Sequence, residues 1–237
     1  MNRRLQSVDA AVGRAVGLAV AKAPVPGVVK TRLGARVGPE VAAQLAAAAL
    51  HDTLDACESA FGADRCYLAL DGDLADGVDA EILLARVADW SVLPQRGDGF
   101  AARLAHAHQD VAALAGTAVV QVGMDTPQAT GADLRVIVDL LRERADAVLG
   151  PAEDGGWWVL GLARPDLADA LRGVEMSTAR TCAETRLALE AAGALVAVGP
   201  PMRDVDDADD AAYVAGLAPG TRFARCWDQV LAGEVLR

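Results

Sequence analysis

An Asp-Val-Asp triplet at 204–206 is the pattern in this sequence with the most specific chemistry. It follows an apolar run that predicts a strand, and in an extended segment residues two apart point to the same side. Two carboxylates on one side, Asp204 and Asp206, suit a hard divalent cation and a diphosphate bound to it. The acidic residues that continue to Asp210 fit the start of a helix better, because the helix dipole favours negative charge there.

A second carboxylate, Asp125, lies in a Gly-Met-Asp-Thr-Pro segment at the end of another predicted strand. A carboxylate at the tip of a buried strand is costly unless it is solvated or paired. Mg²⁺ or Mn²⁺ is a natural partner, because both ions prefer oxygen ligands. The alternative interpretation is an N-cap for the following helix, a role that Asp or Thr can serve equally well.

Positive charge gathers in the segment 21–33, directly after the first predicted strand. Two prolines and Gly27 stiffen this loop, which carries Lys22, Lys30 and Arg32. Concentrated positive charge in an acidic protein predicts phosphate binding, and a solvated basic loop is the alternative. In open α/β sheets, ligands bind beyond the carboxyl ends of the strands, which favours the phosphate interpretation. The P-loop pattern is excluded, because Pro24 and Val29 stand where it requires glycine.

A fourth segment, 151–161, runs from acidic residues through paired glycines into an aromatic strand. Gly155 and Gly156 allow backbone N–H groups to approach a ligand closely beside Asp154, although a plain turn would also explain them. The three histidines have no serine or cysteine nucleophile at a strand-to-helix elbow. The four cysteines are scattered without a CxxC pair, so a triad hydrolase and a zinc site are both excluded.

Length and composition limit the class of protein. The 237 residues are 53% hydrophobic and 23% charged, which predicts one α/β domain with a large core. A net charge of −11 argues against a nucleic-acid partner. No uncharged apolar stretch reaches the roughly 18 residues that a membrane span needs, and the N-terminal apolar run is too short for a signal peptide, so we expect a cytoplasmic protein. We further expect residues 1–14 to form a loosely ordered arm and residues 15–237 to form the domain.

Short strand-like runs alternate with longer helical ones, which is typical of a three-layer α/β/α fold with a mostly parallel mixed sheet. The predicted strands are 16–21, 65–70, 91–94, 118–123, 147–150, 157–162 and 195–198. The predicted helices are 39–61, 100–114, 131–144, 179–192, 209–217 and 223–231.

In this order, the motifs resemble the GT-A-like nucleotide-diphospho-sugar transferase superfamily, and in particular its bacterial arsenosugar-biosynthesis-type glycosyltransferase branch. The resemblance covers residues 17–213. Besides the segments above, it rests on the segment 95–99 with Arg103 and on Ser177 and Thr178. It implies a GT-A-like fold, a nucleoside-diphosphate sugar or nucleotide as ligand, a small-molecule acceptor, and Mg²⁺ or Mn²⁺ as cofactor. A homodimer is among the oligomeric states left open.

The resemblance also implies roles for individual residues. It places Asp125 and Asp206 on the metal, and it makes Asp154 a general base or a ligand of a sugar hydroxyl. Lys30 is the second catalytic candidate, because a cation there stabilises the growing charge of the departing diphosphate. The implied nucleotide and phosphate site comprises Ala21, Lys22, Gly27, Lys30, Arg32, Gln95, Gly99 and Arg103. The implied sugar and acceptor side comprises Asp154, Gly155, Gly156, Ser177 and Thr178.

Three departures from the family pattern concern the acceptor or sugar side and leave the substrate open. The segment 100–102 replaces a Leu-Gly-containing stretch, Met176 replaces a tryptophan, and Trp157 and Trp158 replace tyrosines. Glycosyl transfer from a nucleoside-diphosphate sugar is the leading interpretation. Nucleotidyl transfer with release of pyrophosphate, as in the related cofactor guanylyltransferases, is the first alternative. A non-catalytic nucleotide-sugar-binding protein is the second.

Overall fold

The computed structural model describes residues 15–143 and 145–233 of the 237-residue chain. The expected N-terminal arm, 1–14, lies outside the described residues. The strands are β1 (Val16–Lys22), β2 (Cys66–Asp71), β3 (Ser91–Pro94), β4 (Val119–Gly123), β5 (Ala147–Pro151), β6 (Trp157–Leu162) and β7 (Val196–Val198).

These strands form one sheet in the order β3-β2-β1-β4-β6-β5-β7. β6 is antiparallel to its neighbours β4 and β5, and the other neighbouring pairs are parallel. β1 lies in the middle of the sheet, and its side chains are buried from Val16 to Ala21. The mostly parallel mixed sheet of a single α/β domain is therefore confirmed.

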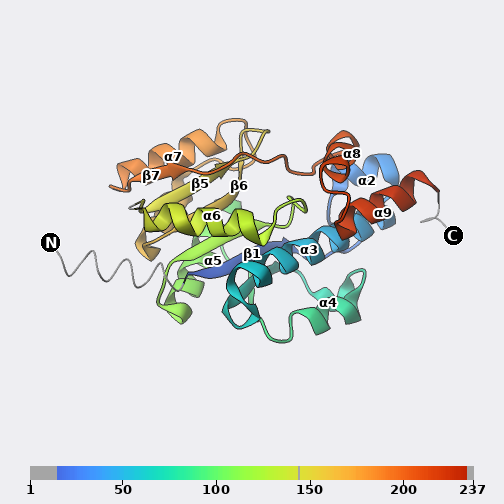
Figure 1. The fold of residues 1–237 in the computed structure, drawn as a ribbon, viewed down its shortest axis with the longest axis horizontal. Helices are drawn as coiled ribbons and strands as arrows, with labels where there is room; N and C mark the ends of the chain where they lie inside the picture. The colour runs from blue at the N-terminus through green and yellow to red at the C-terminus, as the bar shows by residue number, and fades with distance from the viewer. Residues whose placement is uncertain (1–14, 144, 234–237) are drawn as a thin grey trace.

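Helices cover both faces of the sheet (Figure 1). The α-helices are α2 (Thr31–Val37), α3 (Pro39–Phe61), α4 (Ala80–Arg86), α5 (Phe100–Ala115), α6 (Gly131–Arg142), α7 (Thr181–Ala191), α8 (Ala208–Leu217) and α9 (Arg222–Leu231). The 3₁₀ helices are η1 (Ala63–Arg65), η2 (Leu74–Asp76) and η3 (Pro165–Gly173). α3 and α6 pack on one face, and α5 packs with η3 on the other. Among the helices of the described ranges, none has the length and hydrophobicity that a membrane crossing requires.

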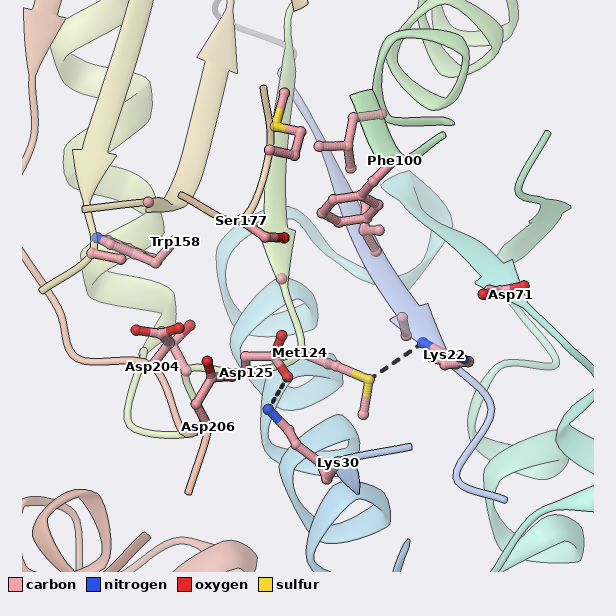
Figure 2. Close-up of a pocket in the computed structure, with 18 of the residues that line it drawn as sticks. Lys22, Lys30, Asp71, Phe100, Met124, Asp125, Trp158, Ser177, Asp204 and Asp206 are labelled. Atoms are coloured by element: carbon pink, nitrogen blue, oxygen red, sulfur yellow. Dashed lines mark hydrogen bonds and ion pairs between the residues drawn. The ribbon is translucent and has the colours of Figure 1, made fainter. Parts of the chain in front are cut away.

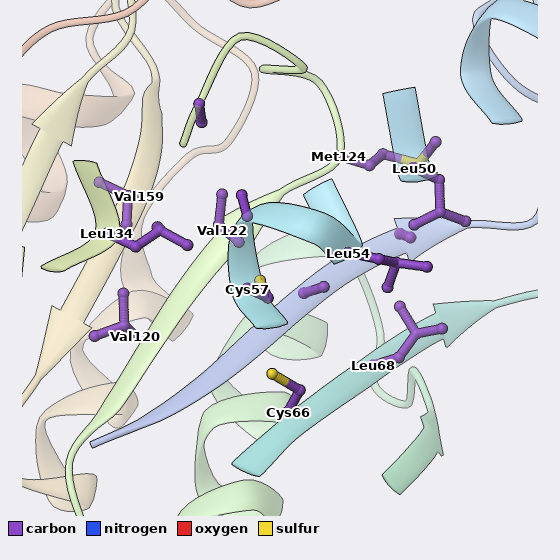
Figure 3. Close-up of a cluster of buried hydrophobic side chains, with 14 of the residues drawn as sticks. Leu50, Leu54, Cys57, Cys66, Leu68, Val120, Val122, Met124, Leu134 and Val159 are labelled. Carbon is purple, nitrogen blue, oxygen red and sulfur yellow. The ribbon is translucent and has the colours of Figure 1, made fainter. Parts of the chain in front are cut away.

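The core on the α3 and α6 face joins segments that are distant in the sequence (Figure 3). Leu54 of α3, Leu134 of α6 and Val120 of β4 are fully buried there. Strand side chains alternate between the faces, so Leu18 and Leu160 pack in the second core beside α5. A third apolar cluster, around Leu33 and Phe223, holds α2, α8 and α9 against α3. The sheet is thus buried on both faces, which leaves the ends of its strands for ligand contacts.

Local signals explain where the helices around the site begin. α3 starts at Pro39, whose missing N–H is harmless at the first helical position. Thr130 and Asp133 form a capping box at the start of α6, so Asp125 is not the cap of that helix. Asp207 and Asp210 form a second capping box at α8. The helix-start interpretation therefore holds for the acidic residues from Asp207 onward.

The buried face of α5 contains His108, which is 1% exposed and whose Nε2 has no hydrogen-bond partner among the described residues. Burial lowers the pKa of this imidazole to about 3. Because the pKa of His108 is lower in the native state than its unfolded-state value of about 6.5, the stability contributed by the neutral imidazole is complete above pH of about 6.5. This contribution is lost as the pH falls toward 3. This one side chain should therefore lower the free energy of unfolding by about 2 kcal/mol between pH 7.5 and pH 5.

Urea denaturation at the two pH values tests this, with His108→Leu as the variant. We expect the variant to lose about 2 kcal/mol less stability than the wild type on acidification. His106→Gln, on the more accessible side of the same helix, is the control and should keep the wild-type response. Equal acid sensitivity of the wild type and His108→Leu would contradict the prediction.

Candidate functional site

A cavity of about 570 Å³ opens at the edge of the sheet where β1, β2 and β4 have their carboxyl ends. Contributions to its wall come from the loop after β1, from α5, from the segment after β4 and from the start of β6. Two further segments, 176–181 and 204–206, complete it. The cavity therefore collects the four segments to which the sequence assigned chemistry.

The basic loop contacts the acidic segments across this cavity (Figure 2). Lys30 pairs with the Asp125 carboxylate and donates a second hydrogen bond to the Val205 carbonyl oxygen. Its side chain is 8% exposed. Lys30 adopts the left-handed conformation with φ 48°, which is strained for a residue with a side chain and is held here by these contacts. Lys30 therefore ties the loop after β1 to both acidic segments.

Arg32 and Lys22 complete the positive side of the cavity. Arg32 was expected in a loop but lies in the first turn of α2, which begins at Thr31. Its guanidinium is 2.7 Å from an Asp206 carboxylate oxygen. Lys22, at the end of β1, is exposed and makes no ion pair within residues 15–143 and 145–233. Of these three cations, Lys22 thus has no carboxylate partner among the described residues, whereas Lys30 and Arg32 are each paired with an aspartate.

Three carboxylates gather on the opposite side. Asp154, Asp204 and Asp206 each place an oxygen within 4.8 Å of the others, close enough to hold one metal ion. Burial, and then the negative charges of Asp154, Asp206 and Asp125, raise the pKa of Asp204 to about 6. Unneutralised carboxylates repel one another, and a hard cation with oxygen ligands would relieve that repulsion. The donor set therefore fits Mg²⁺ or Mn²⁺.

This grouping differs from the metal pair inferred from the sequence. Asp206 lies with Asp204 and Asp154, whereas the carboxylate of Asp125 lies against Lys30. The two predicted residues nevertheless come from adjoining segments, since Val205 donates a backbone hydrogen bond of 2.8 Å to the Asp125 carbonyl. Coordination of one ion by both stays a prediction.

The Asp154 loop is fixed to the segment that contains Ser177 and Thr178. Gly156 donates its backbone N–H to the Asp154 carboxylate at 2.7 Å, which orients that side chain. Gly155 has φ 91°, and a Cβ there would lie 2.2 Å from the Ala179 carbonyl oxygen. Only glycine allows this close approach. The tight contact explains Gly155 as a packing residue beside the cavity.

The remaining predicted nucleotide residues lie at the β1 and β2 side of the cavity. The Gln95 side-chain amide donates to the carbonyl oxygens of Ala21 and Ala69, at 2.9 Å and 3.1 Å, and so bridges two neighbouring strands. Arg103, on the first turn of α5, lies 3.0 Å from an Asp71 carboxylate oxygen. Gly99 precedes α5 with φ 83° and acts as its N-cap.

Most of the predicted site residues line this one cavity, and some do not. Those in the lining are Ala21, Lys22, Lys30, Arg32, Gln95, Arg103, Asp125, Asp154, Gly156, Ser177 and Asp206. Gly27, Gly99, Gly155 and Thr178 lie outside the lining and shape the neighbouring backbone. Their assignment to the binding site stays a prediction.

Sequence reasoning left several lining residues unassigned, among them Asp71, Gln121, Thr126 and Thr181. Gln121 had a readable signal, because it is the one polar side chain in the strand VVQVG. Asp71 follows the apolar run of β2 in the same way that Asp125 follows β4. Phe100, Trp157, Trp158 and Met176, at the positions that depart from the family pattern, also line the cavity.

Comparisons with solved structures find the same fold. A putative nucleotide-diphospho-sugar transferase from Desulfovibrio desulfuricans G20 matches with a TM-score of 0.76 and 26% identity, over 93% of this chain and 98% of that one. A cytidylyltransferase from Leptospira borgpetersenii matches with a TM-score of 0.59 and 13% identity, over 93% and 94%. A 4-diphosphocytidyl-2C-methyl-D-erythritol synthase from Anaerococcus prevotii matches with a TM-score of 0.54 and 10% identity, over 88% and 98%. The nucleotide-diphospho-sugar transferase fold is therefore confirmed.

A comparison with curated proteins finds no match to this sequence. A family model matches residues 53–178, which is more than half of the chain. The matched range includes β2 to β6 and two of the four chemistry-bearing segments, those of Asp125 and Asp154. The chain belongs to the family described as uncharacterized protein conserved in bacteria (DUF2064).

Proposed function

We propose that this protein is a divalent-metal-dependent transferase of the GT-A-like, arsenosugar-biosynthesis-type branch, acting on a nucleoside-diphosphate sugar. One observation carries the proposal: Asp154, Asp204 and Asp206 face Lys22, Lys30 and Arg32 in a single cavity at the carboxyl ends of the strands. A metal diphosphate carries both kinds of charge, so it needs both kinds of partner. The likeness to a putative nucleotide-diphospho-sugar transferase supports the same class.

The three clustered aspartates would hold the cation, with Asp125 at the edge of the group. When bound, a divalent cation neutralises the charge of the diphosphate and makes it a better leaving group. Asp206 belongs to the carboxylate cluster and also pairs with Arg32 of α2, so this ion pair joins the acidic and basic sides of the cavity. Charge on either side of the cavity therefore influences the other.

The cations after β1 would bind the phosphate oxygens. Lys22 is exposed at the end of β1, while Lys30 and Arg32 can exchange a carboxylate partner for a phosphate oxygen through modest movements of long side chains. Charge-assisted contacts of this kind stabilise the negative charge that grows on the departing diphosphate. Asp154, oriented by Gly156, is then the candidate general base or hydroxyl ligand on the sugar side.

A thermal-shift panel tests the proposed function. Nucleoside di- and triphosphates and nucleotide sugars would be added with and without Mn²⁺, because a ligand that binds only the native state raises the midpoint of unfolding. We expect the largest shifts from a nucleoside diphosphate and its sugar, and only with Mn²⁺. No shift from any nucleotide would contradict the proposal.

The class of reaction has its own prediction, because the same fold also occurs in cytidylyltransferases. We expect slow hydrolysis of, or transfer from, a nucleoside-diphosphate sugar, and no exchange of labelled pyrophosphate into nucleoside triphosphates. The Asp154-Gly155-Gly156 loop motivates this expectation, because it belongs to the glycosyltransferase-like pattern. Metal-dependent pyrophosphate exchange would instead identify a nucleotidyltransferase.

A further inference from the structure

Two buried polar side chains of the cavity lining, Gln121 of β4 and Thr126 in the segment after it, have an oxygen without a hydrogen-bond partner among the described residues. Gln121 of β4 is 2% exposed and lines the cavity. Its Oε1 accepts no hydrogen bond from the described residues. Because strand side chains alternate, Gln121 points to the α5 face, opposite to Val120 and Val122 in the α3 core. An amide oxygen that can accept a hydrogen bond is therefore held at the bottom of the proposed active site.

The described residues around Gln121 give its Oε1 no hydrogen-bond donor in place of water. Its sheet neighbours are Leu18 and Leu160, both fully buried. Val20, Leu104 and Met176 line the same part of the wall. A buried acceptor left unpaired bears the full penalty of desolvation, and an apolar residue would pack in this strand without that penalty. Glutamine at this position therefore lowers the stability of the protein unless a ligand supplies the missing donor.

The space above Gln121 has the character of a sugar subsite. Phe100 and Ser177 face one another across the cavity (Figure 2). Ser177 is exposed and has φ 61°, a strained conformation for a residue other than glycine. An aromatic side chain and a hydroxyl on opposite walls, with an amide oxygen on the floor, match a ligand that has both apolar faces and hydroxyl groups.

We propose that Gln121 is a specificity-determining residue, whose Oε1 accepts a hydrogen bond from one hydroxyl of the sugar in a nucleoside-diphosphate sugar. The proposal rests on the function proposed above and adds the group that selects among sugars. A site built to bond a hydroxyl rejects the analogue without it, because the buried acceptor then stays unpaired. Gln121 does not touch the phosphates in this scheme, so it should not affect binding of the nucleoside diphosphate alone.

Calorimetry with matched ligands tests the proposal. The nucleoside diphosphate that binds best with Mn²⁺ is chosen first, followed by its glucose conjugate and the monodeoxyglucose conjugates. We expect wild type to bind the glucose conjugate at least about tenfold more tightly than one monodeoxy conjugate, equivalent to about 1.4 kcal/mol. Gln121→Met, which keeps the length but removes the acceptor, should abolish this preference and change the affinity for the nucleoside diphosphate less than twofold.

Gln44→Met is the matched control. Gln44 also has a buried Oε1 without a partner among the described residues, but it lies on α3 outside the cavity lining. It should leave the sugar preference unchanged. Gln121→Leu provides a second apolar variant if the methionine perturbs packing, and both Gln121 variants should raise the urea midpoint of the ligand-free protein.

The outcomes separate the two proposals. If no nucleoside diphosphate binds, the proposed function fails, and the role of Gln121 fails with it. If the nucleoside diphosphate binds but wild type does not discriminate against any monodeoxy conjugate, only the role of Gln121 is overturned. The same holds if Gln121→Met and Gln121→Leu retain the wild-type preference.

Discussion

Asp204→Asn should remove most of the Mn²⁺-dependent stabilisation of this protein and lower turnover of a nucleoside-diphosphate sugar by about 100-fold or more. Asp204 lies inside the carboxylate group, within 4.8 Å of Asp154 and Asp206. Loss of even an outer-shell partner of a metal lowers affinity or activity by roughly 10- to 100-fold, so loss of a ligand should reach or exceed that range. Mn²⁺ at about 100 times its Kd stabilises the native state by about 2.7 kcal/mol, and the variant should lack this gain.

Thermal unfolding during a Mn²⁺ titration measures the effect. Asp209→Asn is the matched control, because it removes the same charge from the same acidic run but lies exposed on α8, outside the cavity lining. Without metal, Asp204→Asn should unfold at a temperature equal to or above that of wild type, since it relieves repulsion among neighbouring acids. An unchanged Mn²⁺ response in Asp204→Asn would exclude the cluster as the metal site.

The same titration examines whether Asp125 shares the ion with Asp206. If both contact one cation, the Asp125→Asn/Asp206→Asn double variant should be little worse than either single variant, because residues that serve one ion act as a unit. If Asp125 acts mainly on Lys30, as their ion pair indicates, its effect on Mn²⁺ binding should be smaller and should add to that of Asp206→Asn.

The sequence predicted the elements of the fold closely because its strands are apolar runs bounded by turn residues. Ser91–Pro94, Trp157–Leu162 and Pro39–Phe61 have the predicted boundaries. The insertion of β6 between β4 and β5 in an antiparallel direction was not predicted strand by strand. Strand order depends on contacts between distant segments, which local periodicity does not encode.

The sequence predicted which segments form the candidate site, but not which of their side chains form ion pairs with one another. The strand ends identified Asp125 and the loop of Lys30, since parallel strands bring their carboxyl ends to one edge. The ion pair between Lys30 and Asp125, and that between Arg32 and Asp206, join residues 95 or more positions apart. Such pairs depend on side-chain reach across the cavity, so only the structure shows them.

Lys30→Met should weaken binding of a nucleoside diphosphate by about 1.5 to 3 kcal/mol, or roughly 10- to 150-fold, as expected for the loss of one charge-assisted contact. It should also lower the free energy of unfolding, because Asp125 loses its cation and the Val205 carbonyl loses a donor. Since the Asp125 side chain is 48% exposed, water compensates for part of this loss, and we expect about 1 to 2 kcal/mol.

A double variant separates the two effects of Lys30. In Lys30→Met/Asp125→Asn the uncompensated carboxylate is gone but the Val205 carbonyl still lacks its donor, so part of the lost stability should return, whereas nucleotide affinity should stay low because the phosphate still lacks its cation. Arg36→Met is the matched control, since Arg36 is a cation of α2 outside the cavity lining. Calorimetry and urea denaturation together give both quantities. If the double variant recovers nucleotide affinity as well as stability, Lys30 serves to neutralise Asp125 and does not bind phosphate.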